Sequence, residues 1–219
     1  MSFSHSDHDF YDILNSGIDT CPLCCLEEEN VKRSMKVLLY ESVTKRQFRK
    51  DIRFSRICRK HYDMFNKSVK EDLTVAGLGP AIIFWDMIKS QMEAMEKGQL
   101  FKKSPDRECY FCKYTASMPE RIANSAYNVL KSAKGLKAFE LSESVICFDH
   151  FELLTKTARK KKDKPFSDSI KRLQIEKLNI LVKKLRSFID KHDYASKDKI
   201  DLDEANSLSI AFKTLLKIL

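Results

Sequence analysis

The sequence predicts an all-α protein made of two related helical halves. Apolar residues recur at helical spacing over long stretches, and only five glycines and five prolines interrupt the 219 residues. No segment shows the apolar–polar alternation of a half-buried strand. A duplicated set of cysteines and histidines then divides the chain into two comparable parts, which indicates an internal repeat.

Each set consists of a C-x2-C pair followed by a C-x2-H pair, and the second set follows the first at a distance of 88 to 89 residues. This spacing is typical of four-coordinate zinc sites. Residues 55–58 and 144–147 are also similar, which favours duplication over coincidence. We therefore expect two metal sites, one in each half, each a treble-clef-like zinc knuckle with a helix. The predicted ligands are Cys21, Cys24, Cys58 and His61 in the first half, and Cys109, Cys112, Cys147 and His150 in the second.

Four parts are expected along the chain: a flexible leader (1–20), a first zinc-binding repeat (21–98), a linker (99–108) and a second zinc-binding repeat with C-terminal helices (109–219). In the first repeat, Pro22 predicts a tight turn between two thiolates. The periodicity then predicts helices over 27–44, 46–53, from Cys58 onward, and from Gly79-Pro80 to Gly98. Trp85 and the methionines of this last helix are expected in the core.

The second repeat follows the same plan. A capping box at 117–120 begins a helix that Gly135 is expected to end. Further helices are predicted after Cys147, over 165–192, and from 203 to the C-terminus. The last helix carries an apolar stripe that must pack on this chain or on a second copy, so it permits a homo-oligomer. The stripe consists of Leu208, Ala211, Phe212, Leu215, Leu216 and Leu219.

The charge balance is basic, with a net charge of +9 and a pI near 9.1. Residues 1–104 carry +2 and the remainder +7. This balance permits a nucleic-acid partner. Tentative nucleic-acid-binding residues are Arg56, Arg59, Lys60, Arg159, Lys160, Lys161 and Lys162. The N-terminus lacks a signal-peptide pattern, and the longest apolar run is too short for a membrane span. Paired cysteines without these signals favour metal binding in the cytoplasm.

Three thiolates and one imidazole saturate a tetrahedral zinc ion, which indicates a structural metal. Three other uses of these residues remain open: an iron–sulfur cluster, a thiol redox or zinc-release switch, and a catalytic Cys–His dyad. Cys25 has no counterpart in the second set and is either a spectator or a reactive thiol. The sequence contains no phosphate-binding glycine loop, G-x-S-x-G or H-E-x-x-H motif. His192-Asp193-Tyr194 favours a helix cap over a site.

These observations predict a non-enzymatic binding or adaptor protein with two structural zinc ions and a protein partner. The alternatives are a basic regulator associated with nucleic acid and a thiol-based redox or zinc-release sensor.

The paired C-P-x-C and C-x-x-H sets, the Gly-Leu-Gly-Pro-Ala-Ile-Ile segment at 77–83 and the segment at 188–194 resemble an uncharacterised family of bacterial proteins. That family is frequent among Firmicutes and is described as a domain of unknown function. The resemblance covers nearly the whole chain from Cys21 onward. Tyr110 departs from it, because the second knuckle would carry proline there. The resemblance implies a cytosolic bacterial protein and supplies no activity.

Overall fold

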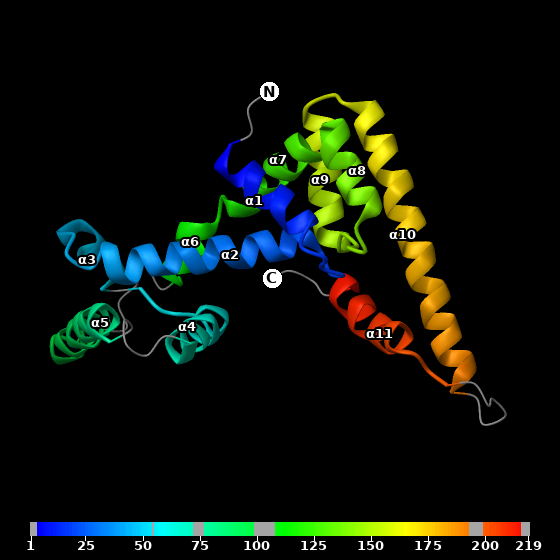
Figure 1. Ribbon diagram of the computed structural model, residues 1–219. Helices are drawn as coiled ribbons and strands as arrows, with labels where there is room; N and C mark the ends of the chain where they lie inside the picture. Colours follow the sequence, from blue (N-terminus) through cyan, green and yellow to red (C-terminus); the bar gives the residue numbers. More distant parts are fainter. Residues whose placement is uncertain (1–3, 54, 72–76, 99–107, 193–198, 216–219) are drawn as a thin grey trace. The chain divides into compact units, whose positions relative to one another are not determined.

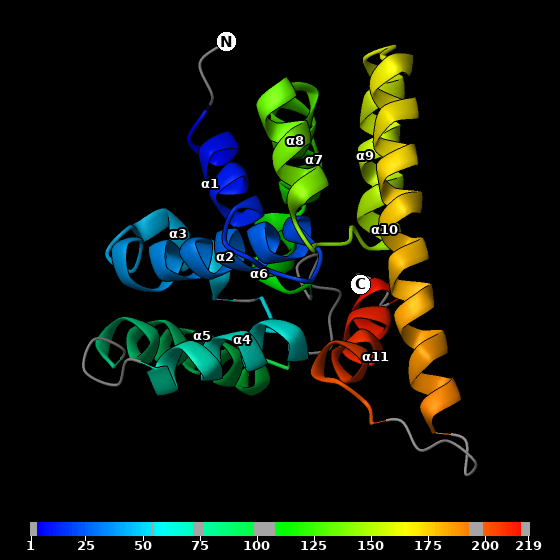
Figure 2. The ribbon, with the colours of Figure 1, turned by 45° about the vertical axis from the view of Figure 1, so that its right-hand side comes forward.

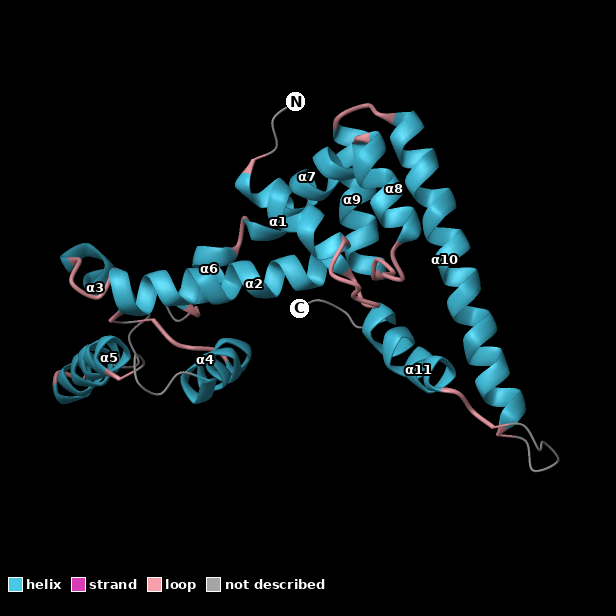
Figure 3. Cartoon of the chain, viewed as in Figure 1, coloured by secondary structure: helices cyan, strands magenta, loops and turns pink. Residues whose placement is uncertain are grey.

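A computed structural model describes residues 4–53, 55–71, 77–98, 108–192 and 199–215. Nearly all of these residues are helical, and the described part contains no strand (Figures 1 and 3). The predicted all-α class is confirmed. None of the described helices is long and apolar enough to cross a membrane. The helices are α1 (His5–Leu14), α2 (Pro22–Lys36), the π-helix η1 (Val37–Glu41), α3 (Arg46–Ile52), α4 (Arg59–Glu71), α5 (Leu78–Glu96), α6 (Tyr110–Thr115), α7 (Met118–Lys131), α8 (Ala133–Leu141), α9 (Phe148–Lys160), α10 (Lys164–Lys191) and α11 (Leu202–Leu215).

The chain divides into two compact units that do not follow each other in sequence. Unit 1 consists of Met1–Glu27 and Met118–Leu219, and unit 2 consists of Glu28–Ser117. The chain therefore begins in unit 1, forms unit 2 as an insertion, and returns to unit 1. This division differs from the expected consecutive repeats over 21–98 and 109–219. Most of the expected linker, residues 99–107, lies outside the described residues.

Unit 1 is organised around packed helices in which α7 contacts α1, α8 and α9, and α10 contacts α9 and α11 (Figure 2). Its centre is filled by side chains with no solvent exposure, such as Phe10, Leu130, Phe139 and Leu154. Burying each such side chain contributes about 1.5–3 kcal/mol.

The expected flexible leader is instead the first helix of unit 1. Ser4 caps α1, because its hydroxyl accepts from the Asp7 backbone N–H while the Asp7 carboxylate accepts from the Ser4 N–H. Phe10 then buries its ring completely where α1 packs on α7 and α8. The polar composition of residues 1–9 concealed this one anchoring aromatic.

Gly135 does not end a helix, as the sequence suggested, but lies in the first turn of α8. Ser132 caps this helix by accepting a hydrogen bond from the Gly135 N–H. A Cβ atom on Gly135 would lie 2.1 Å from the carbonyl oxygen of Val129 in α7. The glycine is therefore required for the close approach of α7 and α8, and the chain continues as helix beyond it.

In unit 2, α5 packs on η1 and α3. Ile83 and Met87 lie on its buried face, and Asp86 forms an ion pair with Arg49 of α3. Trp85 is 58% exposed, with the Lys89 ammonium 4.8 Å from its ring centroid. The expectation that Trp85 packs in the core is wrong, because the buried face of α5 lies on the other side of the helix.

The two knuckles are helix starts rather than tight turns. Helix α2 begins at Pro22 and α6 begins at Tyr110, so Cys24 and Cys112 lie in the first turn of their helices. Proline is well suited to the first position of a helix, because its missing N–H has no intrahelical partner there. Tyr110 fills the same position without proline.

Candidate metal centres

All eight residues predicted as metal ligands lie in two clusters of four. Site 1 consists of Cys21, Cys24, Cys147 and His150, and site 2 consists of Cys58, His61, Cys109 and Cys112. Within each site the donor atoms lie within 4.8 Å of one another. Each site thus combines the C-x2-C pair of one set with the C-x2-H pair of the other. The predicted pairing within each set is wrong, and the two sites are nested along the chain.

Two contacts explain the exchange of partners. In unit 1, α1 packs on α7 and α8, and α7 packs on α9, so the start of α2 is held next to the start of α9. In unit 2, the backbone of Arg56 pairs with the segment around Cys109: Arg56 N–H donates to the Glu108 carbonyl and Tyr110 N–H donates to the Arg56 carbonyl. This bridge places the start of α4 beside the start of α6.

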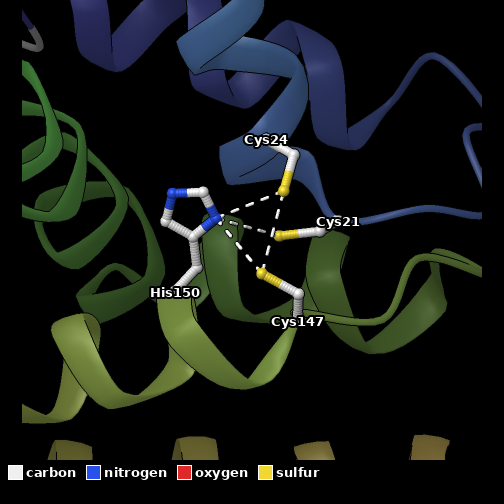
Figure 4. Close-up of side chains that lie close together, drawn as sticks. All are labelled: Cys21, Cys24, Cys147 and His150. Atoms are coloured by element: carbon white, nitrogen blue, oxygen red, sulfur yellow. Dashed lines mark hydrogen bonds between the residues drawn. The ribbon is translucent and has the colours of Figure 1, made fainter. Parts of the chain in front are cut away.

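Site 1 is built from the first turns of α2 and α9 (Figure 4). The His150 Nδ1 atom faces the three sulfurs, at 3.6 Å from Cys21 Sγ and 3.3 Å from both Cys24 Sγ and Cys147 Sγ. The Cys24 and Cys147 sulfurs are 3.7 Å apart. Cys147 is fully buried and His150 is 1% exposed, so site 1 is largely closed to water.

A carboxylate lies behind the imidazole of site 1. The Nε2 atom of His150 is 3.5 Å from Oε2 of Glu27, which lies one turn after the knuckle in α2. A carboxylate in this position fixes the tautomer of a metal-bound histidine, because the Nε2–H points to it and the Nδ1 lone pair points to the metal. The sequence suggested only helix capping for Glu27. Its spacing of three residues after Cys24 was the one signal that could have revealed this role.

Site 2 repeats the donor geometry with a more open surface. The His61 Nδ1 atom lies 3.2 Å from Cys58 Sγ and 3.5 Å from both Cys109 Sγ and Cys112 Sγ, and the Cys58 and Cys112 sulfurs are 3.7 Å apart. His61 is 3% exposed and Cys109 is 8% exposed, whereas Cys112 is solvent-exposed. Among the described residues, no carboxylate pairs with the His61 ring.

The protonation tendencies of the metal-free side chains differ between the sites. Burial lowers the pKa of His61, and Lys60 lowers it further. Burial also acts to lower the pKa of His150, but its contacts with Cys147, Cys21 and Glu27 raise that pKa to about 11. Burial raises the pKa of Cys112 to about 12, together with Cys58. A metal ion at site 1 must therefore displace a proton from His150, while His61 already favours its neutral ligand form.

The helix starts favour thiolates at the two cysteines that precede the histidines. The pKa of Cys147 is lowered by its contacts with Cys21 and Cys24, and by the His150 backbone N–H. Burial raises the pKa of Cys58, but the His61 backbone N–H and Cys112 outweigh it and lower the pKa overall. Backbone N–H groups at a helix N-terminus stabilise negative charge in this way.

The donor spacings fit a single tetrahedral ion at each site. Bonds of about 2.3 Å to sulfur and about 2.0 Å to nitrogen at tetrahedral angles place two sulfurs about 3.8 Å apart, and a sulfur and the nitrogen about 3.5 Å apart. The observed separations of 3.7 Å, and of 3.2–3.6 Å, match this geometry at both sites. All seven cysteines are free thiols, so no disulfide competes for the ligands. Both clusters could hold a metal ion.

Cys25 lies outside both clusters. Its sulfur is 3.8 Å from the hydroxyl oxygen of Thr20, and its side chain is partly buried. The cysteine without a counterpart is thus not a fifth ligand of site 1.

The residues suggested for nucleic-acid binding do not form one group, because three lie in unit 2 and four in unit 1. All seven are exposed. Arg59 pairs with Asp63 at 2.9 Å, and Lys160 pairs with Glu120 at 3.0 Å. His192, at the end of α10, packs its ring on Phe188 and caps the helix with its backbone N–H. Asp193 and Tyr194 lie outside the described residues.

Comparison with known proteins gives one match. A family model described as a family of unknown function, DUF6062, matches residues 86–212, which is more than half of the chain. The matched segment contains two ligands of each site: Cys109 and Cys112 of site 2, and Cys147 and His150 of site 1. No curated protein and no solved structure matches the chain. The chain is a member of the DUF6062 family, with two Cys3His clusters that could each hold a metal ion.

Proposed function

We propose that the protein is a non-enzymatic binding protein whose two units are each stabilised by a structural zinc ion. The observation that carries this proposal is that four protein donors surround one point at each site. Three thiolates and one imidazole fill a tetrahedral zinc ion, so no position remains for water or a substrate. Structural zinc sites supply on the order of 10 kcal/mol toward folding.

Zinc is favoured over an iron–sulfur cluster by the donor spacing. All four donors of a site lie within 4.8 Å of one another, which leaves room for one ion but not for several iron and sulfide atoms between them. Iron–sulfur clusters are also held mostly by four cysteines rather than by three cysteines and a histidine.

Elemental analysis of the purified, tag-free chain tests the metal assignment, with an expected two zinc ions per chain and no visible absorbance. Cobalt substitution tests whether the sites are closed. Co²⁺ in a closed tetrahedral site should keep its visible spectrum unchanged when azide or imidazole is added. A spectrum that changes would reveal an open coordination position and would support a catalytic metal instead.

We further propose that the partners are proteins, one of them a second copy of this chain, in the cytoplasm of a bacterial cell. The support lies on α11, whose buried face consists of Ser207, Ile210 and Thr214. Leu208, Phe212 and Leu215 are 58%, 67% and 71% exposed on its other face. Phe212→Glu should shift a dimer to a monomer in light scattering coupled to gel filtration. A wild-type chain that is monomeric at high concentration contradicts the self-association.

A second candidate function is nucleic-acid binding. Arg159, Lys160 and Lys161 line a cleft of about 470 Å³ in unit 1 together with Lys156. Phosphate contacts by such residues would weaken steeply with salt, because binding releases counterions. Fluorescence anisotropy with duplex and single-stranded probes at 50 and 200 mM salt tests this function. A lack of binding at the lower salt concentration rules out this cleft as a phosphate-binding surface.

A third candidate function is thiol-based sensing at site 2. Cys112 is solvent-exposed although it is a ligand, and exposed thiolates are the ones that oxidise. Mild peroxide should then release one of two zinc ions per chain, and reductant should restore it. Retention of both ions under peroxide would exclude the sensor.

A further inference from the structure

Unit 1 contains a cavity that neither metal site uses. It has a volume of about 300 Å³ and lies between the end of α8, the segment that follows it, α10 and α11. Its floor is apolar and includes Val145, Leu173, Leu181 and Ile210, all less than 10% exposed. Cavities of this size lie at the lower end of small-molecule sites.

A buried lysine, Lys177 of α10, lines this cavity. Lys177 is 8% exposed, its ammonium donates to the backbone carbonyl of Ser142, and it lies 4.7 Å from the ring centroid of Phe139. An ammonium group has three donors, and no carboxylate among the described residues pairs with this one. Burial lowers the pKa of Lys177, while Glu140 and Glu143 partly oppose that effect through space. A buried cation without an anionic partner is costly, so this wall of the cavity suits a carboxylate.

Three carboxylates line the opposite character of the same cavity. Glu140, Glu143 and Glu176 are exposed, and none of them pairs with a cation among the described residues. Their proximity contrasts with the net charge of +9 of the whole chain. A ligand that brought only a carboxylate to Lys177 would be repelled by these groups. A ligand that also carried an ammonium group would satisfy them.

We propose that this cavity binds a free α-amino acid with an apolar side chain of the size of leucine or phenylalanine. The carboxylate of the ligand pairs with Lys177, its ammonium pairs with the glutamates, and its side chain packs on the floor formed by Leu173, Leu181 and Ile210. The three features of the cavity each receive a matching group of one small molecule. This site is separate from the metal ligands, and it does not depend on the proposed function.

Isothermal titration calorimetry of the zinc-loaded full chain tests the site, with L-leucine and L-phenylalanine as the probes. We expect saturable binding at one molecule per chain. The analogue 3-methylbutan-1-amine lacks the carboxylate of leucine, and 4-methylpentanoate lacks its amine. Each should bind at least about tenfold more weakly, because each loses one charge contact. An absence of saturable binding by both amino acids, or equal binding of either analogue, overturns the proposal.

Two lysine variants locate the binding. Lys177→Met removes the ammonium and should weaken leucine binding at least about tenfold. Lys183→Met is the matched control, because Lys183 is exposed on the same helix and does not line the cavity. Equal affinities of the two variants overturn the assignment to this cavity. If Lys177→Met does not fold, the two leucine analogues decide the question on the wild-type chain.

Discussion

Site 1 and site 2 have the same donor set and nearly the same donor spacings, but they differ in what surrounds the donors. In site 1, two cysteines and the histidine are buried, and the Glu27 carboxylate lies behind the imidazole. In site 2, Cys112 is exposed and no described carboxylate pairs with His61. Ligand type and spacing therefore do not determine how firmly a metal is held. Solvent access and the contacts of the histidine do, and both favour tighter binding at site 1.

The largest expected effect comes from double variants that distinguish nested from consecutive sites. Cys21→Ser with Cys58→Ser removes one ligand from each nested site, so both metal ions should be lost. Cys21→Ser with Cys147→Ser removes two ligands from site 1 alone, so one ion should remain. Elemental analysis of the two purified proteins gives the answer. The reverse result, with one ion in the first variant and none in the second, would restore the consecutive pairing.

Removal of metal by a chelator should proceed in two phases, with one equivalent leaving faster. Exposed Cys112 gives the competing ligand access to site 2, whereas site 1 is closed by burial. We expect rates that differ by roughly tenfold or more, on the scale seen when a histidine lacks its carboxylate partner. A colorimetric zinc indicator measures both phases. Cys109→Ser should retain only the slow phase, and retention of the fast phase in this variant would assign the labile ion to site 1.

Glu27→Gln should make site 1 resemble site 2. The amide cannot hold the Nε2–H of His150 as a carboxylate does, so the zinc affinity of site 1 should fall by about 10- to 100-fold. Site 2 should not change. Competition with a chelator of known affinity measures both sites. Glu28→Gln is the control, because that exposed side chain pairs with Lys32 on the helix surface; equal effects of the two variants would remove Glu27 from the site.

The smallest expected effect separates the stability of unit 1 from its metal. Glu204 of α11 accepts from Lys191, from Ser187 and from the Asp201 backbone N–H, and these contacts lower its pKa to about 2. Because an unfolded glutamate has a pKa of about 4.3, this stabilisation is complete above that pH and is lost as the pH falls toward 2.

Glu204→Gln should therefore lower the thermal midpoint of unit 1 at pH 7 and at pH 5 by a similar small amount. The difference from wild type should close below about pH 4, and zinc content at pH 7 should stay at the wild-type value. Asp203→Asn is the matched control, since Asp203 is exposed and pairs only with Lys184 at 3.2 Å. A difference that grows on acidification would contradict the assigned ion pair.

Much of the fold follows from local patterns. The helices α3, α5, α10 and α11 begin and end close to the residues that periodicity and punctuation predicted, because those signals act within one or two turns. The failures lie where a distant contact decides. A single buried ring, Phe10, turns the expected leader into α1, and the approach of α7 to α8 gives Gly135 a role that no local rule contains.

The sequence by itself determined the helical class and the eight candidate ligands, because those depend on residue type and short spacing. It did not determine which pairs meet. Both C-x2-C pairs present the same two thiolates from a helix start, and both C-x2-H pairs present the same cysteine and histidine, so either pairing satisfies the local chemistry. The packing of α1 on α7 and α8, and the backbone bridge between Arg56 and Cys109, choose the nested arrangement. Those contacts join segments that are far apart in the chain, and only the tertiary structure contains them.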